Sequence, residues 1–193
     1  MSVSPVSRPR DLVLALLALP LVSFAGPTSA AEPVQCLQGE GFQVAYRERA
    51  DSVGTDIVVR SVTGTGKPAC TLKKQPGDAA IGGRDDANYV KGLSGRFLVL
   101  DQGTGPDRTL SIIDLATRKP VVSVGYDDNE PVEIKPGSVS FWAVTGKGTA
   151  ANCPAFKEYS ANGLEAALIR QTVVSLPEAR SQASGPSKCI AQQ

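Results

Sequence analysis

The chain has 193 residues, with 20 lysine and arginine residues against 19 aspartate and glutamate residues, and it contains no histidine. The absence of histidine excludes Ser-His-Asp and Cys-His catalysis, a histidine general base and histidine metal ligands. The near-neutral charge gives no general attraction to nucleic acid or anionic lipid, so we expect neither as a partner.

Residues 1–31 have the pattern of a secretory signal peptide. Arg8 and Arg10 form a positive region, an apolar run follows, and small residues lead to cleavage after Ala30 or Ala31. The apolar run is shorter than the ~20 residues that a membrane-spanning helix needs. Cleavage would remove both arginines and one aspartate, which leaves 18 basic and 18 acidic residues and no membrane span.

The mature chain, residues 32–193, is predicted to be a single disulfide-bonded, β-rich domain in the periplasm or outside the cell. An even number of cysteines in an exported chain indicates disulfides, and four cysteines allow three pairings. We favour Cys36–Cys70 with Cys153–Cys189, because each bond closes a loop at one end of the chain. The spacings contain no Cys-x-x-Cys pair, which argues against a zinc site.

The first part of the mature chain predicts strands. Phe42, Val44 and Tyr46 alternate with polar residues, as in a half-buried strand. Residues 75–88 are polar and glycine-rich and are expected to be a loop. The strands expected before this loop lie within residues 39–50, 55–62 and 69–74.

The middle of the chain contains six short β-rich runs separated by turn residues. Their ranges are 87–93, 95–101, 109–115, 119–126, 132–135 and 138–145. The connections are too short for crossover helices, so the runs predict an antiparallel meander. Residues 97–100, Phe-Leu-Val-Leu, suit a central strand that is covered on both faces.

The C-terminal part changes character. Phe156, Tyr159, Leu164 and Leu168 have roughly helical spacing, and an Asn-Gly pair between them is expected to divide the segment into two short helices. Strands are expected after it, within residues 169–176 and 178–189. The predicted fold is therefore mainly β, an antiparallel, meander- or sandwich-like sheet with a short C-terminal helical segment.

Asp101 raises the sharpest functional question, because it ends a strand and opens a glycine-rich loop. With Gly103 and Thr104 it partly matches the catalytic motif of aspartic proteases, although Gln102 replaces the hydroxyl residue and a second carboxylate would have to come from a homodimer. A cation ligand is another interpretation. The favoured interpretation is a strand that ends in a turn.

Further acidic residues occupy the loops of the meander. Two of them could serve a glycosidase, whose carboxyl groups lie ~5–10 Å apart, or several could bind calcium. The simpler interpretation is solvated acids in hairpin turns, and we expect no cofactor and no bound metal. The acids concerned are Asp101, Asp107, Asp127, Asp128 and Glu130.

Other polar and aromatic residues are weaker candidates. Trp142 is predicted to anchor the core or its rim, and with the tyrosines it could line a groove for sugar or peptide. A mixed set of charges looks like surface charge that becomes a site only if the fold brings it to one patch; its members are Lys73, Lys74, Arg84, Asp85 and Asp86. The candidate binding residues are Asp101, Thr104, Asp107, Asp127, Asp128 and Trp142.

Two resemblances extend these observations. "SGRFLVLDQGTGPDRTLSIIDLATRKPVVSVGY" resembles a single β-propeller blade over residues 89–126, without the repeats that a complete propeller needs. "FLVLDQGTGPD", "SIIDLATRKPV" and "NCPAFKEY…GLEAAL" resemble a group of small exported bacterial proteins of unassigned function. That resemblance implies a periplasmic or secreted setting and transfers no catalytic residues.

The leading functional hypothesis is an exported, noncatalytic envelope protein that binds another envelope or secreted protein as an inhibitor-like module. It depends on export, small size, the expected disulfides and the missing catalytic constellations. The alternatives are a carboxylate-based cell-wall glycosidase and a protein that binds a small ligand or calcium. We leave enzymatic activity open and favour its absence.

Overall fold

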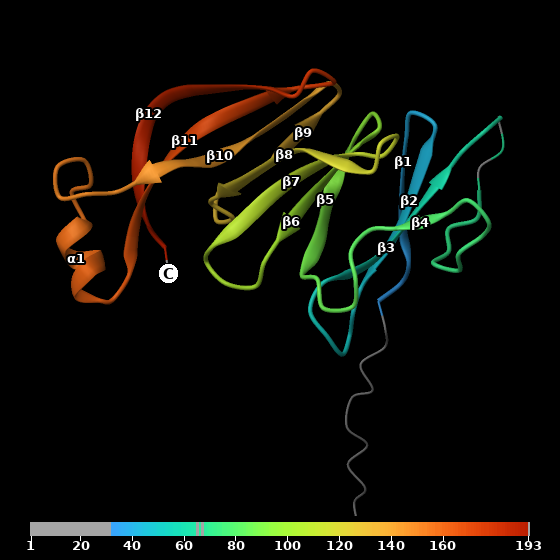
Figure 1. The fold of residues 1–193 in the computed structure, drawn as a ribbon, viewed down its shortest axis with the longest axis horizontal. Coiled ribbons are helices and arrows are strands. Elements are labelled where there is room, and N and C mark those ends of the chain that lie inside the picture. Colours follow the sequence, from blue (N-terminus) through green and yellow to red (C-terminus); the bar gives the residue numbers. More distant parts are fainter. Residues whose placement is uncertain (1–31, 65, 67, 193) are drawn as a thin grey trace, which may run out of the picture.

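The computed structural model describes residues 32–64, 66 and 68–192, so the expected signal peptide lies outside the described residues. The described chain is mainly β, as predicted, with two antiparallel sheets and one short helix (Figure 1). The small sheet has the order β1-β2-β3-β4, and the large sheet has the order β12-β11-β10-β8-β7-β6-β5, with β9 paired to β10. In chain order the elements are β1 (Gln35–Gly39), β2 (Phe42–Glu48), β3 (Thr55–Ser61), β4 (Ala79–Ala80), β5 (Asn88–Ser94), β6 (Phe97–Gln102), β7 (Arg108–Asp114), β8 (Lys119–Tyr126), β9 (Glu133–Lys135), β10 (Ser138–Lys147), α1 (Phe156–Ala161), β11 (Glu165–Ser175) and β12 (Arg180–Gln192).

The small sheet is built on the hairpin of β2 and β3. Gly54 closes its turn with a φ of +85°, and a Cβ at this position would collide with the carbonyl oxygen of Asp86. Gln43, Val44 and Ala45 are all buried, so β2 is covered on both faces in its middle. The prediction of a half-buried strand is therefore wrong for this part of β2, because a loop from outside the sheet covers its second face.

That loop, residues 68–78, is named the cover loop. The strand predicted over residues 69–74 is wrong, because the chain is irregular there. The guanidinium of Arg60 in β3 donates to the carbonyl oxygens of Ala69 at 3.0 Å and Lys73 at 3.3 Å. A side chain thus binds carbonyl groups that a strand would have offered to a neighbouring strand.

The central strand β6 separates two apolar cores, as its sequence predicts. Phe97 and Val99 face one core, and Leu98 and Leu100 face the other. The core on the side of Leu98 also contains Val44, Ile57 and Val59 of the small sheet, so it joins the two sheets. All four side chains of the Phe-Leu-Val-Leu run are at most 5% exposed.

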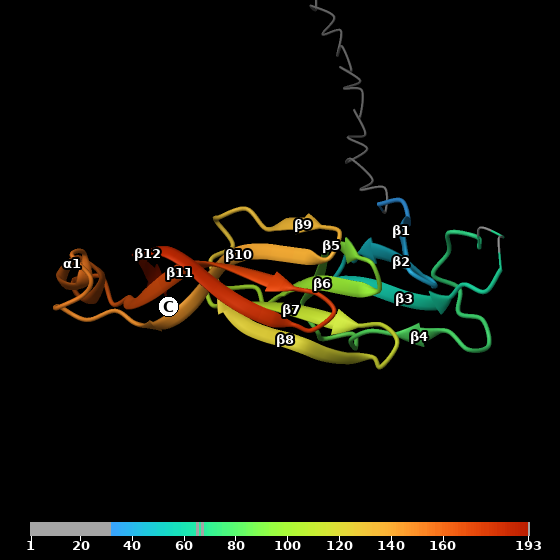
Figure 2. The ribbon, with the colours of Figure 1, turned by 90° about the horizontal axis from the view of Figure 1, so that it is seen from above.

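The large sheet rolls around the other core. β8 and β10 pair only at Tyr126 and Ala143, so the sheet bends sharply between these strands. Beyond the bend, β9 comes back to β5, where the Ser94 hydroxyl donates to the Lys135 carbonyl oxygen at 2.7 Å. Gly92 in β5 permits this approach, because its Cα lies beside the end of the Ile134 side chain. Figure 2 shows the roll from above.

The C-terminal part forms one helix instead of the predicted two. α1 ends at Ala161, and the residues of the second predicted helix belong to β11, between β10 and β12. The alternating burial of β11 includes Ala167, Ile169 and Val174, whose side chains are at most 3% exposed. Pairing with two strands outweighs the helix propensity of the alanine and leucine residues here.

Two disulfides join the expected cysteines. Cys36 in β1 is bonded to Cys70 in the cover loop, and Cys153 before α1 is bonded to Cys189 in β12. The predicted pairing is confirmed. Disulfides of this kind are compatible with an oxidising compartment. In the part of the chain that the structure describes, no helix has the length and apolar character needed to cross a membrane.

Candidate functional site

Asp101, the most prominent residue of the sequence, forms a buried ion pair at the end of β6. Its side chain is 4% exposed. One carboxylate oxygen accepts a hydrogen bond from Arg108 Nε at 2.9 Å, and the other accepts one from Arg108 Nη2. Lys91 Nζ lies 3.7 Å from the same carboxylate. The pair of Asp101 with Arg108 therefore holds the two ends of the loop between β6 and β7 together, and Lys91 adds a contact from β5.

The surroundings of this ion pair are aromatic. The Arg108 guanidinium lies over the Tyr89 ring, 5.4 Å from its centroid. The hydrogen bond with Asp101 raises the pKa of Arg108, so the guanidinium keeps its charge. Burial, followed by the negative charge of Asp101, raises the pKa of Tyr126, so this phenol stays neutral at physiological pH. The cluster joins β5, β6, β7 and β8.

The other predicted acids also have local roles. Asp127 accepts hydrogen bonds from the backbone and side-chain nitrogens of Asn129, which stabilise the turn after β8. Asp128 lies 3.9 Å from Arg108 Nε, and Glu130 pairs with Lys188 at 2.6 Å. Asp127 therefore stabilises a turn, and Asp128 and Glu130 form ion pairs.

Asp107 and Thr104 lie in the exposed part of the loop between β6 and β7. Asp107 lines an open hollow of about 480 Å³ together with Asp85 and Asp86. Asp86 accepts a hydrogen bond from the Gly83 amide at 2.7 Å. Within the described ranges, no group of three or more acidic or cysteine side chains has an arrangement that could hold a metal ion.

Trp142 lies on β10, where its neighbours Phe141 and Ala143 face the core and it remains half-buried. Lys188 Nζ stands 3.8 Å from the centroid of its ring. The same ammonium binds Glu130, so the ring, the cation and the carboxylate form one surface cluster that joins β10 to β12. Trp142 thus lies beside the acidic turn after β8, because the Asp127 amide donates to its carbonyl oxygen at 3.0 Å and Lys188 links its ring to Glu130.

A larger hollow, of about 700 Å³, lies where β2 ends and β3 begins, beside the cover loop and the loop after β4. No sequence motif marks this hollow, because its wall comes from three separate segments. These segments contribute residues 47–52 and 56–58, Leu72 and Lys74, and residues 80–84. We name it the β2–β3 hollow.

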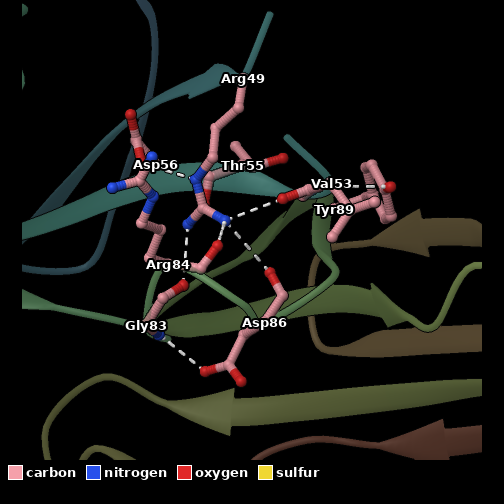
Figure 3. Close-up of polar contacts among 9 residues, drawn as sticks. Arg49, Val53, Thr55, Asp56, Gly83, Arg84, Asp86 and Tyr89 are labelled. Carbon is pink, nitrogen blue, oxygen red and sulfur yellow. Dashed lines mark hydrogen bonds and ion pairs between the residues drawn. The ribbon is translucent and has the colours of Figure 1, made fainter. Parts of the chain in front are cut away.

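Arg49 fixes the wall of this hollow. Its side chain is only 9% exposed, and its Nε donates to Asp56 at 2.8 Å. The rest of the guanidinium donates to backbone carbonyl oxygens from both sides of the hollow (Figure 3). These oxygens belong to Val53 at 2.8 Å, Arg84 at 2.7 Å, Gly83 at 2.9 Å, Thr55 at 3.2 Å and Asp86 at 3.4 Å.

The wall therefore joins the β2–β3 turn to the segment after β4 through one charged side chain. Hydrogen bonds that involve a charged donor are stronger than neutral ones. The nearby Tyr89 hydroxyl also accepts a hydrogen bond from the Gly54 amide at 3.3 Å, which connects the turn to β5. Rigid backbone on both sides suits a preformed binding site.

Three basic side chains line the hollow without an ion-pair partner among the described residues. They are Arg47, Lys74 and Arg84. Of the charges that the sequence analysis grouped, the fold brings only Lys74 and Arg84 to this hollow, whereas Asp85 and Asp86 line the smaller one and Lys73 lines neither. Arg47 carried no signal of its own, because nothing in the sequence shows which face of β2 meets the cover loop.

Comparisons with protein-family models, with curated proteins and with solved structures found no match to this chain. The resemblances to a propeller blade and to small exported bacterial proteins stay predictions. The site is therefore described by its own geometry.

Proposed function

We propose that the chain is an exported, noncatalytic binding protein of the periplasm or the extracellular space, and that it binds another protein through the β2–β3 hollow. The observation that carries this proposal is the contrast between two sets of charges. Three of the five acids that could have served catalysis, Asp101, Asp128 and Glu130, form ion pairs within the protein, whereas three basic side chains of the hollow form none among the described residues.

Asp101 illustrates the first set. A general acid or base must be able to exchange a proton near the operating pH. The Asp101 carboxylate is only 4% exposed and is already bound by Arg108 and Lys91, so it is not placed to exchange a proton with a substrate. This argues for a noncatalytic role and against the glycosidase alternative.

The export part of the proposal depends on the signal pattern of residues 1–31 and on the cysteines. Both disulfides close loops of similar length, with separations of 34 and 36 residues. Such bonds form and persist in oxidising compartments. A binding partner is accordingly expected among envelope or secreted proteins.

The loop between β6 and β7 is a second candidate surface, in keeping with an inhibitor-like role. Its ends are held by the Asp101–Arg108 pair and by a hydrogen bond from the Gly103 amide to the Ala87 carbonyl oxygen at 3.0 Å. Its tip, residues 104–107, is exposed. A rigid base with an exposed tip is a common arrangement for a loop that enters the cleft of an enzyme.

A cross-linked capture experiment tests the proposal. The mature, oxidised protein is immobilised and incubated with envelope extract of the source cells, in parallel with a variant whose residues 103–107 are replaced by Gly and Ser. One dominant partner that both proteins retain supports a binding protein whose site is not that loop, whereas its loss from the loop variant would move the binding site from the hollow to the loop. Failure to enrich any partner, together with unchanged rates for a panel of lysozymes and proteases, would contradict the proposal.

A further inference from the structure

The β2–β3 hollow has a net positive interior once the orientation of each charged residue is considered. Asp56 is committed to Arg49. Glu48 follows Arg47 in β2, so its side chain points to the opposite face of the sheet. Its charge helps to raise the pKa of Tyr46, second to burial, which places the Glu48 carboxylate on the Tyr46 side of the strand. Asp51, in the exposed turn, is the remaining acid of the wall.

The fold fixes the backbone positions of the cations that line the hollow with these acids. Arg47 lies directly across from Asp56 in the pairing of β2 with β3, so both side chains share the face that meets the hollow. The backbone of Arg84 is fixed by its carbonyl bond to Arg49. Lys74 lies near enough to Asp78 to contribute to the lowered pKa of that carboxyl, yet it makes no ion pair with it.

The floor between the cations is apolar. It contains Val58, Leu72, Ala80 and Ile81, of which Val58 is 6% exposed and the others are more accessible. A volume of about 700 Å³ falls within the range of ligand sites in proteins, which is roughly 300–1,000 Å³. A ligand that fits this surface has apolar groups and several negative charges around them.

We infer that the β2–β3 hollow binds an acidic peptide segment of the partner protein, with carboxylates on Arg47, Lys74 and Arg84 and an apolar side chain on the floor. This inference rests on the proposed binding function and specifies its ligand. Guanidinium groups suit carboxylates because their planar fork can donate two parallel hydrogen bonds. The fixed backbone on both sides reduces the ordering that binding requires.

The test uses the mature, oxidised protein and a defined peptide. The probe is the peptide Glu-Leu-Glu-Ser-Leu-Glu, with fluorescein attached to an N-terminal extension and an amide at the C-terminus. Its binding is followed by fluorescence anisotropy. We expect saturable binding that weakens with added salt, and no comparable binding of the same peptide with every Glu replaced by Gln or by Lys. The variants R47Q and R84Q should each weaken binding about tenfold, and K74Q about threefold.

The matched control is the triple variant K119Q/K157Q/R180Q, which loses the same charge as R47Q/K74Q/R84Q at exposed positions outside the hollow. It should bind the acidic peptide within twofold of the wild type. K74Q changes an exposed side chain, so it tests the inference even if Arg47 variants fold poorly. Circular dichroism of every variant verifies folding.

Three results would overturn the inference. They are a Kd for the acidic peptide weaker than about 1 mM, equal weakening by both triple variants, and binding to vesicles with anionic lipid in place of the peptide. The capture experiment separates this failure from that of the proposed function. A partner that is captured equally by wild type and R47Q/K74Q/R84Q leaves the role of a noncatalytic binding protein in place and removes the hollow as its binding site.

Discussion

At the scale of single residues, two arginines organise the ends of the strands. Arg49 joins the β2–β3 turn to the segment after β4, and Arg108 neutralises Asp101 at the end of β6. Both guanidinium groups are largely removed from solvent, with exposed fractions of 9% and 13%. Each therefore has a structural role that a smaller or monodentate cation cannot fill.

Replacement of Arg49 by Lys is expected to lower the free energy of unfolding by about 2–3 kcal/mol, because one ammonium cannot reach the carbonyl oxygens that the guanidinium binds. Urea unfolding of the mature, oxidised protein measures this. The control is Arg47→Lys in the same strand, which should change the free energy by less than about 0.5 kcal/mol. Equal effects of the two substitutions would contradict the role assigned to Arg49.

Replacement of Asp101 by Asn is expected to lower the free energy of unfolding by about 3 kcal/mol, because it leaves the Arg108 charge without its main partner. Asp107→Asn, in the exposed part of the same loop, should have almost no effect. Chemical unfolding of both variants decides between the interpretations of Asp101. A stable Asp101→Asn protein would reopen the question of a functional carboxylate.

At the scale of elements, the cover loop determines the outer face of the small sheet. The Gln43 side-chain amide donates to the Pro68 carbonyl oxygen at 3.0 Å, and Arg60 binds Asp78 with both carboxylate oxygens. The Cys36–Cys70 bond adds a covalent link to β1. These contacts hold the loop that forms one side of the β2–β3 hollow.

The Arg60–Asp78 pair should make stability depend on pH. The hydrogen bond from Arg60 is the main cause that holds the pKa of Asp78 below its ordinary value of 3.8, against the opposing effect of burial. A lowered folded-state pKa stabilises the fold above the unfolded pKa, and this contribution is lost as pH falls through the folded value. We expect it to be complete above about pH 5 and to decline below pH 3.8.

Urea unfolding between neutral pH and about pH 2.5 tests this dependence, with Asp78→Asn as the comparison. The variant should be less stable at neutral pH by about 3 kcal/mol, the lower end for a buried pair because a single loop covers it. The difference between the two proteins should shrink in acid. A difference that is constant with pH would show that the Asp78 charge does not stabilise the fold.

The two disulfides should contribute similarly to the free energy of unfolding but differently to binding of the acidic peptide. Each closes a loop of similar length, so C36S/C70S and C153S/C189S should each lower the free energy of unfolding by about 3–4 kcal/mol in the chain-entropy description. Only the first pair holds the cover loop, so only C36S/C70S should weaken binding of the acidic peptide. Equal peptide binding by both variants, measured below their unfolding transitions, would contradict this role of the cover loop.

Elements differed in how well the sequence predicted them. The strands of the meander were found because runs of β-forming residues mark the strands and turn residues mark their ends, as in β6 and β7. The segment from Glu165 to Leu168 was predicted as helix because its propensity is helical, and it became strand through pairing with β10 and β12. Local sequence cannot show such long-range pairing.

At the scale of the whole molecule, the small sheet and α1 lie at opposite ends of the rolled large sheet (Figure 1). The mainly β class and both disulfides followed from alternation, turns and export. The rolled shape of the large sheet could not be predicted in this way, because it depends on contacts such as Ser94 with Lys135 that join distant parts of the chain. The β2–β3 hollow was missed for the same reason, since Arg49 and Gly83 meet only in the fold.

The central claim is that the hollow is the binding surface, and quantitative capture tests it most directly. Wild type, R47Q/K74Q/R84Q and the charge-matched K119Q/K157Q/R180Q are compared for the amount of cross-linked partner that each retains from the same envelope extract. We predict that the hollow variant loses most of the partner and that the control retains it. Equal retention by all three proteins would contradict the claim and direct attention to the loop between β6 and β7.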